Sequence, residues 1–192
     1  MENQQKQLRS LVTDDGTLKL SLETIDIPIP GTNEVLVRME AAPINPSDLG
    51  LLLAGADIST AVVSGSTDSP VVTATIPEGR RKGVATRVGK SLPVGNEGGG
   101  VVVAAGASES AQSLMGKTVG IIAGATYSQY RVVKLDQCLA MHDGVTPAES
   151  ASCFVNPQTA LGMVETMKKK GFSALCHTAA ASNLGQMLQK LC

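Results

Sequence analysis

Residues 95–106 read GNEGGGVVVAAG, a glycine-rich turn that runs directly into an apolar strand. Short apolar or β-branched runs lie on both sides of it, namely LKLSLETIDIPIP and EVLVRMEAAPI before it and KTVGIIAG and YSQYRVVKL after it. Turn-forming Pro and Gly residues separate these runs, as at residues 30–33. Up to about residue 145 the pattern predicts a small, partly closed β-barrel.

Two further regions precede the glycine-rich turn. NPSDLGLLLAG at residues 45–55 predicts a short helix that Asn45 or Ser47 caps. Residues 58–90 are rich in Val, Thr, Ser and Gly. This region predicts hairpin strands, one of them GVATRVG at residues 83–89.

The hydrophobic period changes after residue 145. Thr146 and Pro147 predict a helix start, and a second helix pattern runs from about residue 157 to 170. FSALCHTAAASNLGQMLQKLC then predicts a buried strand at 174–178, a turn of small residues and a helix. Because a parallel strand needs neighbours on both sides, we expect this last β-α unit to be the front of an incomplete domain.

Composition narrows the classes of function. The 16 Lys and Arg residues nearly balance the 17 Asp and Glu residues, so no basic surplus exists for nucleic acid or an anionic membrane. Trp is absent, and two Tyr and two Phe are too few to stack bases. The N-terminal residues are polar and no apolar run reaches about 18 residues. We therefore expect a soluble, cytoplasmic protein that binds neither nucleic acid nor membranes.

The cysteines do not form a metal-binding or disulfide pattern. Cys138, Cys153, Cys176 and Cys192 lie 15, 23 and 16 positions apart, without a Cys-x-x-Cys pair. This spacing fits neither a zinc ribbon nor a disulfide framework. We expect reduced and mostly buried thiols.

The turn TAAASNLG at residues 178–185 is the first candidate for chemistry. In a dinucleotide-binding G-x-G-x-x-G turn, small residues let the backbone approach a pyrophosphate at a helix N-terminus. Here the three glycine positions hold Ala180, Ser182 and Gly185, so one glycine remains. These residues by themselves fit either a nucleotide site or an ordinary tight β-α turn.

Five motifs carry a family resemblance over nearly the whole chain. They are AAPINPSD (41–48), GNEGGGVV (95–102), YSQYRVV (127–133), NPQTALG (156–162) and HTAAASNLG (177–185). In this order they resemble the medium-chain dehydrogenase/reductase superfamily, in its zinc-free NADPH:quinone oxidoreductase-like branch, with enoyl thioester reductases as relatives. The resemblance implies a mixed α and β fold, with a GroES-like β-barrel domain at residues 1–145. Residues 146–192 would be connecting helices and the first β-α unit of a Rossmann α/β domain.

The resemblance also implies a function. The protein would be an NADP(H)-dependent, zinc-independent oxidoreductase that transfers hydride to a quinone or an activated unsaturated carbonyl compound such as an enone. The full-length form would be a homodimer paired through edge strands of the Rossmann sheet. We expect the chain alone to be inactive because its nucleotide domain is incomplete. The alternative is a structural or assembly module built on the barrel and completed by a partner chain.

The same resemblance assigns candidate site residues. It implies that Asn45 contacts the nicotinamide or the substrate and that Asp48 fixes the loop carrying it, so both are catalytic candidates. A helix cap and a turn explain these two residues equally well. The cofactor-binding candidates are Asn45, Thr159, Ala180, Ala181, Ser182, Asn183, Leu184 and Gly185.

Departures from the zinc-dependent relatives are equally informative. The zinc-ligand positions look like Asn45 or a neighbour, Asn96 and Val155, none of them a good ligand, so we predict no metal. Glu97 follows the acidic position of the superfamily, and we expect it to be a hydrogen-bonded, buried carboxylate that steadies the glycine turn. In the related enoyl reductases a tyrosine in the loop before the glycine-rich motif donates a proton, and residues 49–94 contain no tyrosine, which argues against the enoyl-thioester reaction. Tyr127 or Tyr130 on a different strand is the alternative donor, but we expect both to pack at the barrel edge.

Overall fold

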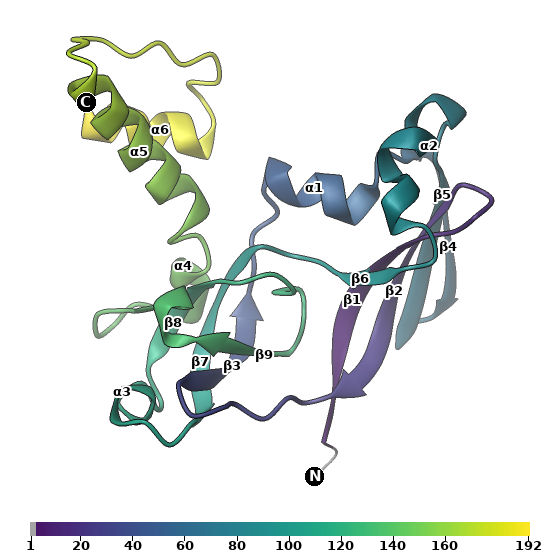
Figure 1. Cartoon of the computed structure of the whole chain (residues 1–192), viewed down its shortest axis with the longest axis horizontal. Coiled ribbons are helices and arrows are strands. Elements are labelled where there is room, and N and C mark those ends of the chain that lie inside the picture. Colours follow the sequence, from purple (N-terminus) through teal and green to yellow (C-terminus); the bar gives the residue numbers. More distant parts are fainter. Residues whose placement is uncertain (1–2) are drawn as a thin grey trace.

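The computed structural model describes residues 3–192, in which ten strands form two antiparallel sheets (Figure 1). The strands of the first sheet are β1 (Gln4–Val12), β2 (Thr17–Asp26), β4 (Asp57–Ser66), β5 (Ser69–Thr75) and β6 (Ser91–Pro93). Those of the second are β3 (Glu34–Ala41), β7 (Glu97–Ala105), β8 (Thr118–Ile122), β9 (Tyr130–Lys134) and β10 (Cys138–Ala140). The spatial orders are β4-β5-β2-β1-β6 and β10-β8-β7-β3-β9.

The segment 127–129 joins the two sheets. The backbone N–H of Leu8 in β1 donates to the Tyr127 carbonyl at 2.9 Å, and that of Gln129 donates to Lys6 at 3.1 Å. On the other side, the N–H of Met39 in β3 donates to the Gln129 carbonyl at 2.8 Å. The sheets are thus closed along one side, which confirms the partly closed barrel predicted from the strand pattern.

Each sheet buries its own set of mainly aliphatic side chains. In the first sheet the buried set includes Val12, Leu18, Ala74 and Ile76. In the second it includes Val35, Val37, Val102, Val119, Ile121 and Val133. Burying one such larger aliphatic side chain contributes about 1.5–3 kcal/mol, so these two clusters hold the barrel together.

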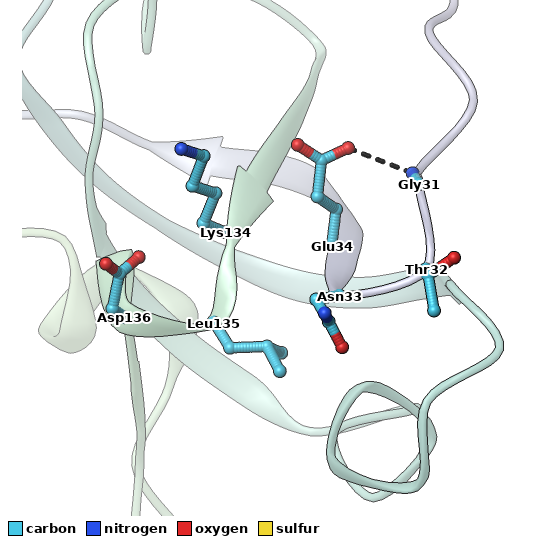
Figure 2. A pocket seen from close by; sticks show the side chains of 7 residues that line it. All are labelled: Gly31, Thr32, Asn33, Glu34, Lys134, Leu135 and Asp136. Atoms are coloured by element: carbon cyan, nitrogen blue, oxygen red, sulfur yellow. Dashed lines mark hydrogen bonds between the residues drawn. The ribbon is translucent and has the colours of Figure 1, made fainter.

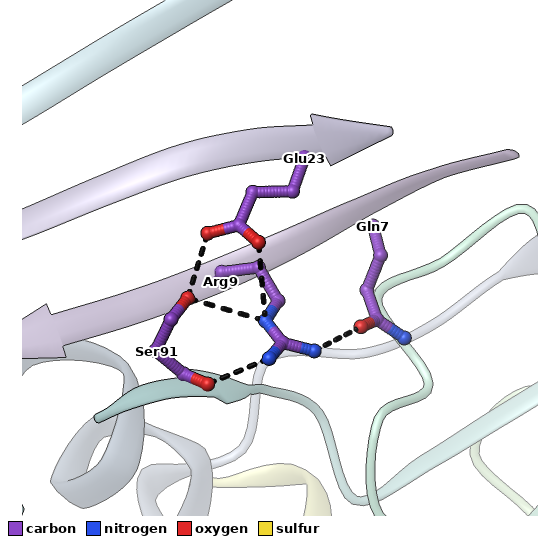
Figure 3. Close-up of polar contacts among 4 residues, drawn as sticks. All are labelled: Gln7, Arg9, Glu23 and Ser91. Carbon is purple, nitrogen blue, oxygen red and sulfur yellow. Dashed lines mark hydrogen bonds and ion pairs between the residues drawn. The ribbon is translucent and has the colours of Figure 1, made fainter. Parts of the chain in front are cut away.

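Arg9 connects three strands of the first sheet (Figure 3). Its Nη2 donates to the Ser91 carbonyl of β6 at 2.6 Å, and its Nε lies 3.8 Å from the Glu23 carboxylate of β2. Nη1 donates to Gln7 on β1 itself at 2.7 Å. The Ser91 hydroxyl donates to Glu23 at 2.6 Å. These contacts hold the short strand β6, which leads directly into the glycine-rich turn.

The helices lie outside the two sheets. They are α1 (Pro46–Leu53), α2 (Glu78–Val84), α3 (Glu109–Gln112), α4 (Pro147–Ser150), α5 (Val155–Lys169) and α6 (Asn183–Leu191). Helices α5 and α6 pack on each other through Ala160, Val164 and Leu188, beside the barrel (Figure 1). No helix within residues 3–192 is long and apolar enough to cross a lipid bilayer.

The region 58–90 follows the prediction only in part. Strands β4 and β5 form the expected hairpin, but GVATRVG at residues 83–89 is not a strand. These residues end α2 and form a 3-10 turn at Ala85–Arg87. The Arg87 guanidinium donates to the carbonyls of Gly50 and Leu51 at 3.1 and 2.7 Å, and these tertiary contacts favour the compact turn.

The predicted buried strand at 174–178 is wrong. This segment is irregular and mostly exposed, and it links α5 to α6. A strand needs a neighbour for its backbone hydrogen bonds, and residues 3–192 place no strand beside it. Leu175 packs against the α5–α6 pair instead. The expected β-α unit is therefore a turn and a helix, and the division into residues 1–145 and 146–192 stays a prediction.

Candidate functional site

Glu97, the first residue of β7, is the buried centre of the candidate site, with 1% of its surface exposed. Its Oε1 accepts a hydrogen bond from Asn45 Nδ2 at 2.7 Å. Its Oε2 accepts from the backbone N–H groups of Phe154 at 3.1 Å and Val155 at 2.8 Å. These three hydrogen-bond donors offset the desolvation cost of burying the carboxyl group. The expectation of a buried, hydrogen-bonded Glu97 is confirmed.

The side-chain amide of Asn45 is held from two sides. Its Nδ2 is the atom that faces Glu97 and donates to that carboxyl group. Its Oδ1 accepts from Asn156 Nδ2 at 3.4 Å. An amide nitrogen carries two hydrogens, so one hydrogen of Nδ2 remains for a ligand.

Asp48 and Tyr127 support the loop that carries Asn45. The buried Asp48 carboxylate accepts from the Asn45 backbone N–H at 2.7 Å, and the Tyr127 hydroxyl donates to the Pro43 carbonyl at 2.9 Å. Burial, together with the negative charges of Asp48 and Glu97, raises the pKa of Tyr127 to about 12. The phenol therefore stays neutral over the physiological pH range.

A cavity of about 390 Å³ brings the Asn45 loop and the predicted nucleotide turn together. Its lining residues are Ile44, Asn45, Pro46, Asn156, His177, Ala179, Ser182, Asn183 and Leu184. This volume falls within the range of about 300–1,000 Å³ that is typical of small-molecule sites. None of the nine residues is Asp, Glu, Lys or Arg, so a ligand here would be bound by backbone groups and by uncharged or imidazole side chains.

The turn before α6 has a compact backbone. Ser182 caps the helix, because its Oγ accepts from the Gly185 N–H at 3.1 Å and donates to the Ala179 carbonyl at 2.7 Å. A Cβ added to Gly185 would collide with the carbonyl of Ala180. The N–H groups of Asn183 and Leu184 open the helix and have no partner within it. Two backbone donors thus belong to residues that line the cavity.

The remaining predicted site residues lie outside this cavity. Ala180 and Gly185 line a neighbouring cavity of about 250 Å³ together with His177. Ala181 is exposed, and its carbonyl accepts from Gln186 Nε2 at 3.1 Å.

Thr159 is exposed on α5 and lines a third, separate cavity of about 590 Å³. Its hydroxyl donates to the Val155 carbonyl at 2.7 Å, within its own helix. The structure brings Asn45 together with Ser182, Asn183 and Leu184, but not with Thr159.

Two residues of the site were not predicted from the sequence. Asn156 stands in the quoted motif NPQTALG but received no role, and Tyr127 was expected to pack at the barrel edge. Their positions depend on contacts with Asn45 and Pro43, which lie far away in the sequence. For Asn156, the only feature of the sequence that could have indicated a role was its place in the motif NPQTALG, which carries the family resemblance.

The positions that correspond to zinc ligands have other roles. The Asn96 carbonyl accepts from Ala123 at 3.0 Å, and the Val155 N–H donates to Glu97. The Cys153 thiol lies 3.8 Å from the Met141 sulfur, and partial burial next to Glu97 raises its pKa. Between residues 3 and 192 no three His, Cys, Asp or Glu side chains gather as a metal site would require.

A larger cavity lies at the other end of β3 (Figure 2). It has a volume of about 670 Å³ and is lined by residues 31–34 and 134–136. Glu34 accepts from the Gly31 N–H there at 2.9 Å. It contains none of the predicted site residues and most of its lining side chains are exposed, so size alone does not identify the site.

No family model matches the chain, but solved structures do. A protein from Mesorhizobium loti assigned as an NADPH:quinone reductase is 25% identical, with a TM-score of 0.69 over 100% of this chain and 52% of that one. The quinone oxidoreductase from Coxiella burnetii is 16% identical, with a TM-score of 0.66 over 98% and 53%. A mycobacterial protein solved with NADPH is 18% identical, with a TM-score of 0.60 over 97% and 49%. The chain thus spans about half the length of these structures.

Two antiparallel sheets that close into a half-barrel, followed by helices, form the GroES-like N-terminal part of the medium-chain dehydrogenase/reductase fold. In structure the chain is similar to NADPH:quinone reductases and to enoyl reductases. The fold and the resemblance predicted from the five sequence motifs are confirmed at this level.

Proposed function

We propose that these 192 residues are part of an NADP(H)-dependent, zinc-independent oxidoreductase that transfers hydride to a quinone or an activated unsaturated carbonyl compound. The observation that carries the proposal is the cavity in which Asn45 meets Ser182, Asn183 and Leu184. NADP(H), when bound, supplies the hydride, and the protein supplies binding and orientation. In this proposal residues 1–145 form the barrel domain and residues 146–192 begin the nucleotide domain.

The turn before α6 fits a pyrophosphate. The unpartnered N–H groups of Asn183 and Leu184 stand at the positive end of the helix, where an anion is stabilised. Gly185 keeps the turn free of a side chain that would push its backbone apart. No cationic side chain lines this cavity, so the preference for NADPH over NADH rests on the family relation and not on these residues.

Asn45 would hold a carbonyl oxygen of the bound nicotinamide or substrate. Its free Nδ2 hydrogen is a donor whose direction Glu97 and Asn156 fix. A donor held in advance and partly shielded from water stabilises developing negative charge better than a mobile one. Asp48 would position Asn45 through its backbone N–H, without touching the substrate.

The hydride acceptor should be neutral, because the lining contains no Asp, Glu, Lys or Arg side chain to pair with a charge on it. A quinone or an enone satisfies this condition and matches the names of the related reductases. We propose little or no turnover by the 192 residues alone, because they span only about half the length of the related reductases. Steady-state oxidation of NADPH with a quinone tests this, and rapid turnover by the 192-residue chain would contradict it.

NADPH titration followed by amide shifts in NMR spectra tests the site. We expect the shifts to centre on residues 44–46 and 182–184. Gly185→Ala should weaken binding at least about tenfold, equivalent to about 1.4 kcal/mol. Gly162→Ala, on the exposed face of α5 and outside the cavity, is the matched control. Shifts centred elsewhere would contradict the proposed site.

A structural or assembly module remains the alternative function. The observation that favours it is the apolar cavity of about 590 Å³ beside Phe172, which is 66% exposed. Exposed apolar surface of this kind is typical of protein interfaces. Absence of NADPH binding, together with a stable complex that covers residues 159–176, would support the module over the enzyme.

A further inference from the structure

Two side-chain amides, those of Asn45 and Asn156, meet at the wall of the candidate cavity of about 390 Å³. Asn156 Nδ2 donates to Asn45 Oδ1 at 3.4 Å, across 111 positions of the chain. Asn45 is buried in front of α1, and Asn156 is partly buried in the first turn of α5. The tertiary structure therefore holds both amides at the same place in the cavity.

The hydrogen bond from Asn45 to Glu97 sets the orientation of both amides. Asn45 Nδ2 faces the Glu97 carboxyl group at 2.7 Å, so Asn45 Oδ1 is left for Asn156. Only the nitrogen of the Asn156 amide can donate to that oxygen, because a reversed Asn156 amide would bring two oxygens together. The Asn156 oxygen is therefore the atom that the Asn45 contact leaves free.

The amide pair offers one donor and one acceptor to a ligand. Asn45 Nδ2 carries two hydrogens, and Glu97 accepts one of them. Within residues 3–192 no group donates to Asn156 Oδ1, and this oxygen is not among the buried atoms that lack a partner. A ligand in the cavity can thus meet an N–H group and an amide oxygen on two neighbouring residues.

A primary carboxamide is the chemical group that matches this pattern. Its carbonyl oxygen accepts a hydrogen bond, and its –NH2 group donates one from the same planar unit. A ketone offers only the accepting oxygen, and a carboxylate offers two acceptors and no donor. The nicotinamide ring of NADP(H) carries a primary carboxamide, whereas simple quinones and enones carry none.

We propose that Asn156 Oδ1 accepts a hydrogen bond from the carboxamide –NH2 of the nicotinamide while Asn45 Nδ2 donates to its carbonyl oxygen. This inference rests on the proposed function and adds Asn156 as a residue that determines cofactor specificity. It assigns the free Asn45 donor to the cofactor and not to the hydride acceptor. Two hydrogen bonds to one planar group would also fix the rotation of the ring that carries the hydride.

Binding of NADP⁺ and of its 3-acetylpyridine analogue to the 192-residue chain tests the proposal. The analogue keeps the carbonyl oxygen but has a methyl group in place of the amide nitrogen, so it donates nothing to Asn156. We expect NADP⁺ to bind about two- to tenfold more tightly, which is the effect of one uncharged hydrogen bond. In NMR spectra the side-chain amide signals of Asn45 should shift with both ligands, and those of Asn156 should shift more with NADP⁺.

Asn156→Leu removes the acceptor and keeps a side chain of similar size. The two- to tenfold preference for NADP⁺ over the analogue should disappear in this variant. Gln158→Leu is the matched control, because Gln158 is an exposed amide on the same helix and lies outside the cavity. A preference that persists in Asn156→Leu would overturn the assignment, as would one that only Asn183→Leu abolishes, since Asn183 is the other amide in the lining.

The result separates this proposal from the proposed function. If NADP⁺ shifts no signal at residues 44–46 and 182–184, the nucleotide site is absent and both proposals are wrong. If NADP⁺ binds there and the analogue binds equally well, the site stands and the role of Asn156 is wrong. The comparison of the two ligands needs no substitution, so it decides the matter even if Asn156→Leu fails to fold.

Discussion

The side-chain amide of Asn45 donates a hydrogen bond of 2.7 Å to the carboxylate of Glu97, 52 positions further along the chain. Asn45 precedes α1, Glu97 opens β7, and the same carboxylate accepts from Phe154 and Val155 at the start of α5. One buried carboxylate therefore fixes the relative positions of the Asn45 loop, the glycine-rich strand and the long helix. As a result, Asn45 on the loop and Asn156 on the long helix both line the candidate cavity.

Substitutions of Asn45 test how strongly Glu97 depends on it. Asn45→Ala leaves the buried carboxylate one donor short and should lower the free energy of unfolding by about 1–3 kcal/mol. Asn45→Asp keeps the size but places a second carboxylate against Glu97, so the loss at neutral pH should be larger. Urea unfolding measures both values.

The variant Glu97→Gln completes a double-mutant cycle with Asn45→Ala. Because the two side chains are in direct contact, we expect a coupling energy of about 0.5–3 kcal/mol. Additive effects would mean that the pair contributes nothing beyond its separate parts. Equal stability of Asn45→Asp and the original protein would likewise contradict the arrangement.

A pair of glycine substitutions tests the packing of β7 against α4. A Cβ on Gly99 would collide with the carbonyl of Pro147 and the hydroxyl of Ser150, so Gly99→Ala should destabilise the protein by about 1–3 kcal/mol. Gly162 lies in α5 with open space around it, so Gly162→Ala should stabilise by up to about 1 kcal/mol. Thermal unfolding should move in opposite directions for the two variants.

Tyr127 should make stability depend on alkaline pH. Its pKa is about 12 in the folded protein and about 10 when unfolded, so the folded state holds the phenolic proton more tightly. The resulting stability is complete below about pH 10 and is lost as the pH rises towards about 12. Urea unfolding across this interval should show a steeper decline for the original protein than for Tyr127→Phe.

An absorbance titration checks the same residue directly. The chain has two tyrosines and no tryptophan, so the tyrosinate signal that disappears in Tyr127→Phe belongs to Tyr127. That difference should have its midpoint near pH 12. A midpoint near 10 would show that the phenol is not shielded next to Asp48 and Glu97.

Thiol alkylation should separate the cysteines by their surroundings. Burial, together with the charge of Asp136, raises the pKa of Cys138 to about 11, so little of its thiolate is present at mildly alkaline pH. Cys176 and Cys192 are exposed and should be labelled first. Mass spectrometry of timed samples gives the order, and urea should abolish the difference. Early labelling of Cys138 in the folded protein would count against its burial.

The strand pattern up to residue 145 was predictable because its cause is local. In residues 95–106 and in the neighbouring runs, apolar and β-branched side chains are bounded by Gly and Pro turns. The buried state of Glu97 was also predictable from its motif, since a carboxylate within an apolar strand must find donors.

Two segments were wrongly predicted as strands from their composition. Residues 83–89 have strand-like composition, but the contacts of Arg87 with Gly50 and Leu51 hold them in a helical turn. Residues 174–178 have the composition of a buried strand, but they have no neighbouring strand among residues 3–192. Composition reports a preference, whereas a strand also requires a partner for its hydrogen bonds.

The sequence by itself determined the barrel, the short helices after residues 45 and 146 and the identities of Asn45, Ser182 and Asn183 as site candidates. Only the tertiary structure decided that these three share a cavity, that Thr159 lies outside it and that Asn156 meets Asn45 there. Spacing along a chain specifies local geometry. Contacts between distant positions are set by sheet register and by the packing of helices on sheets.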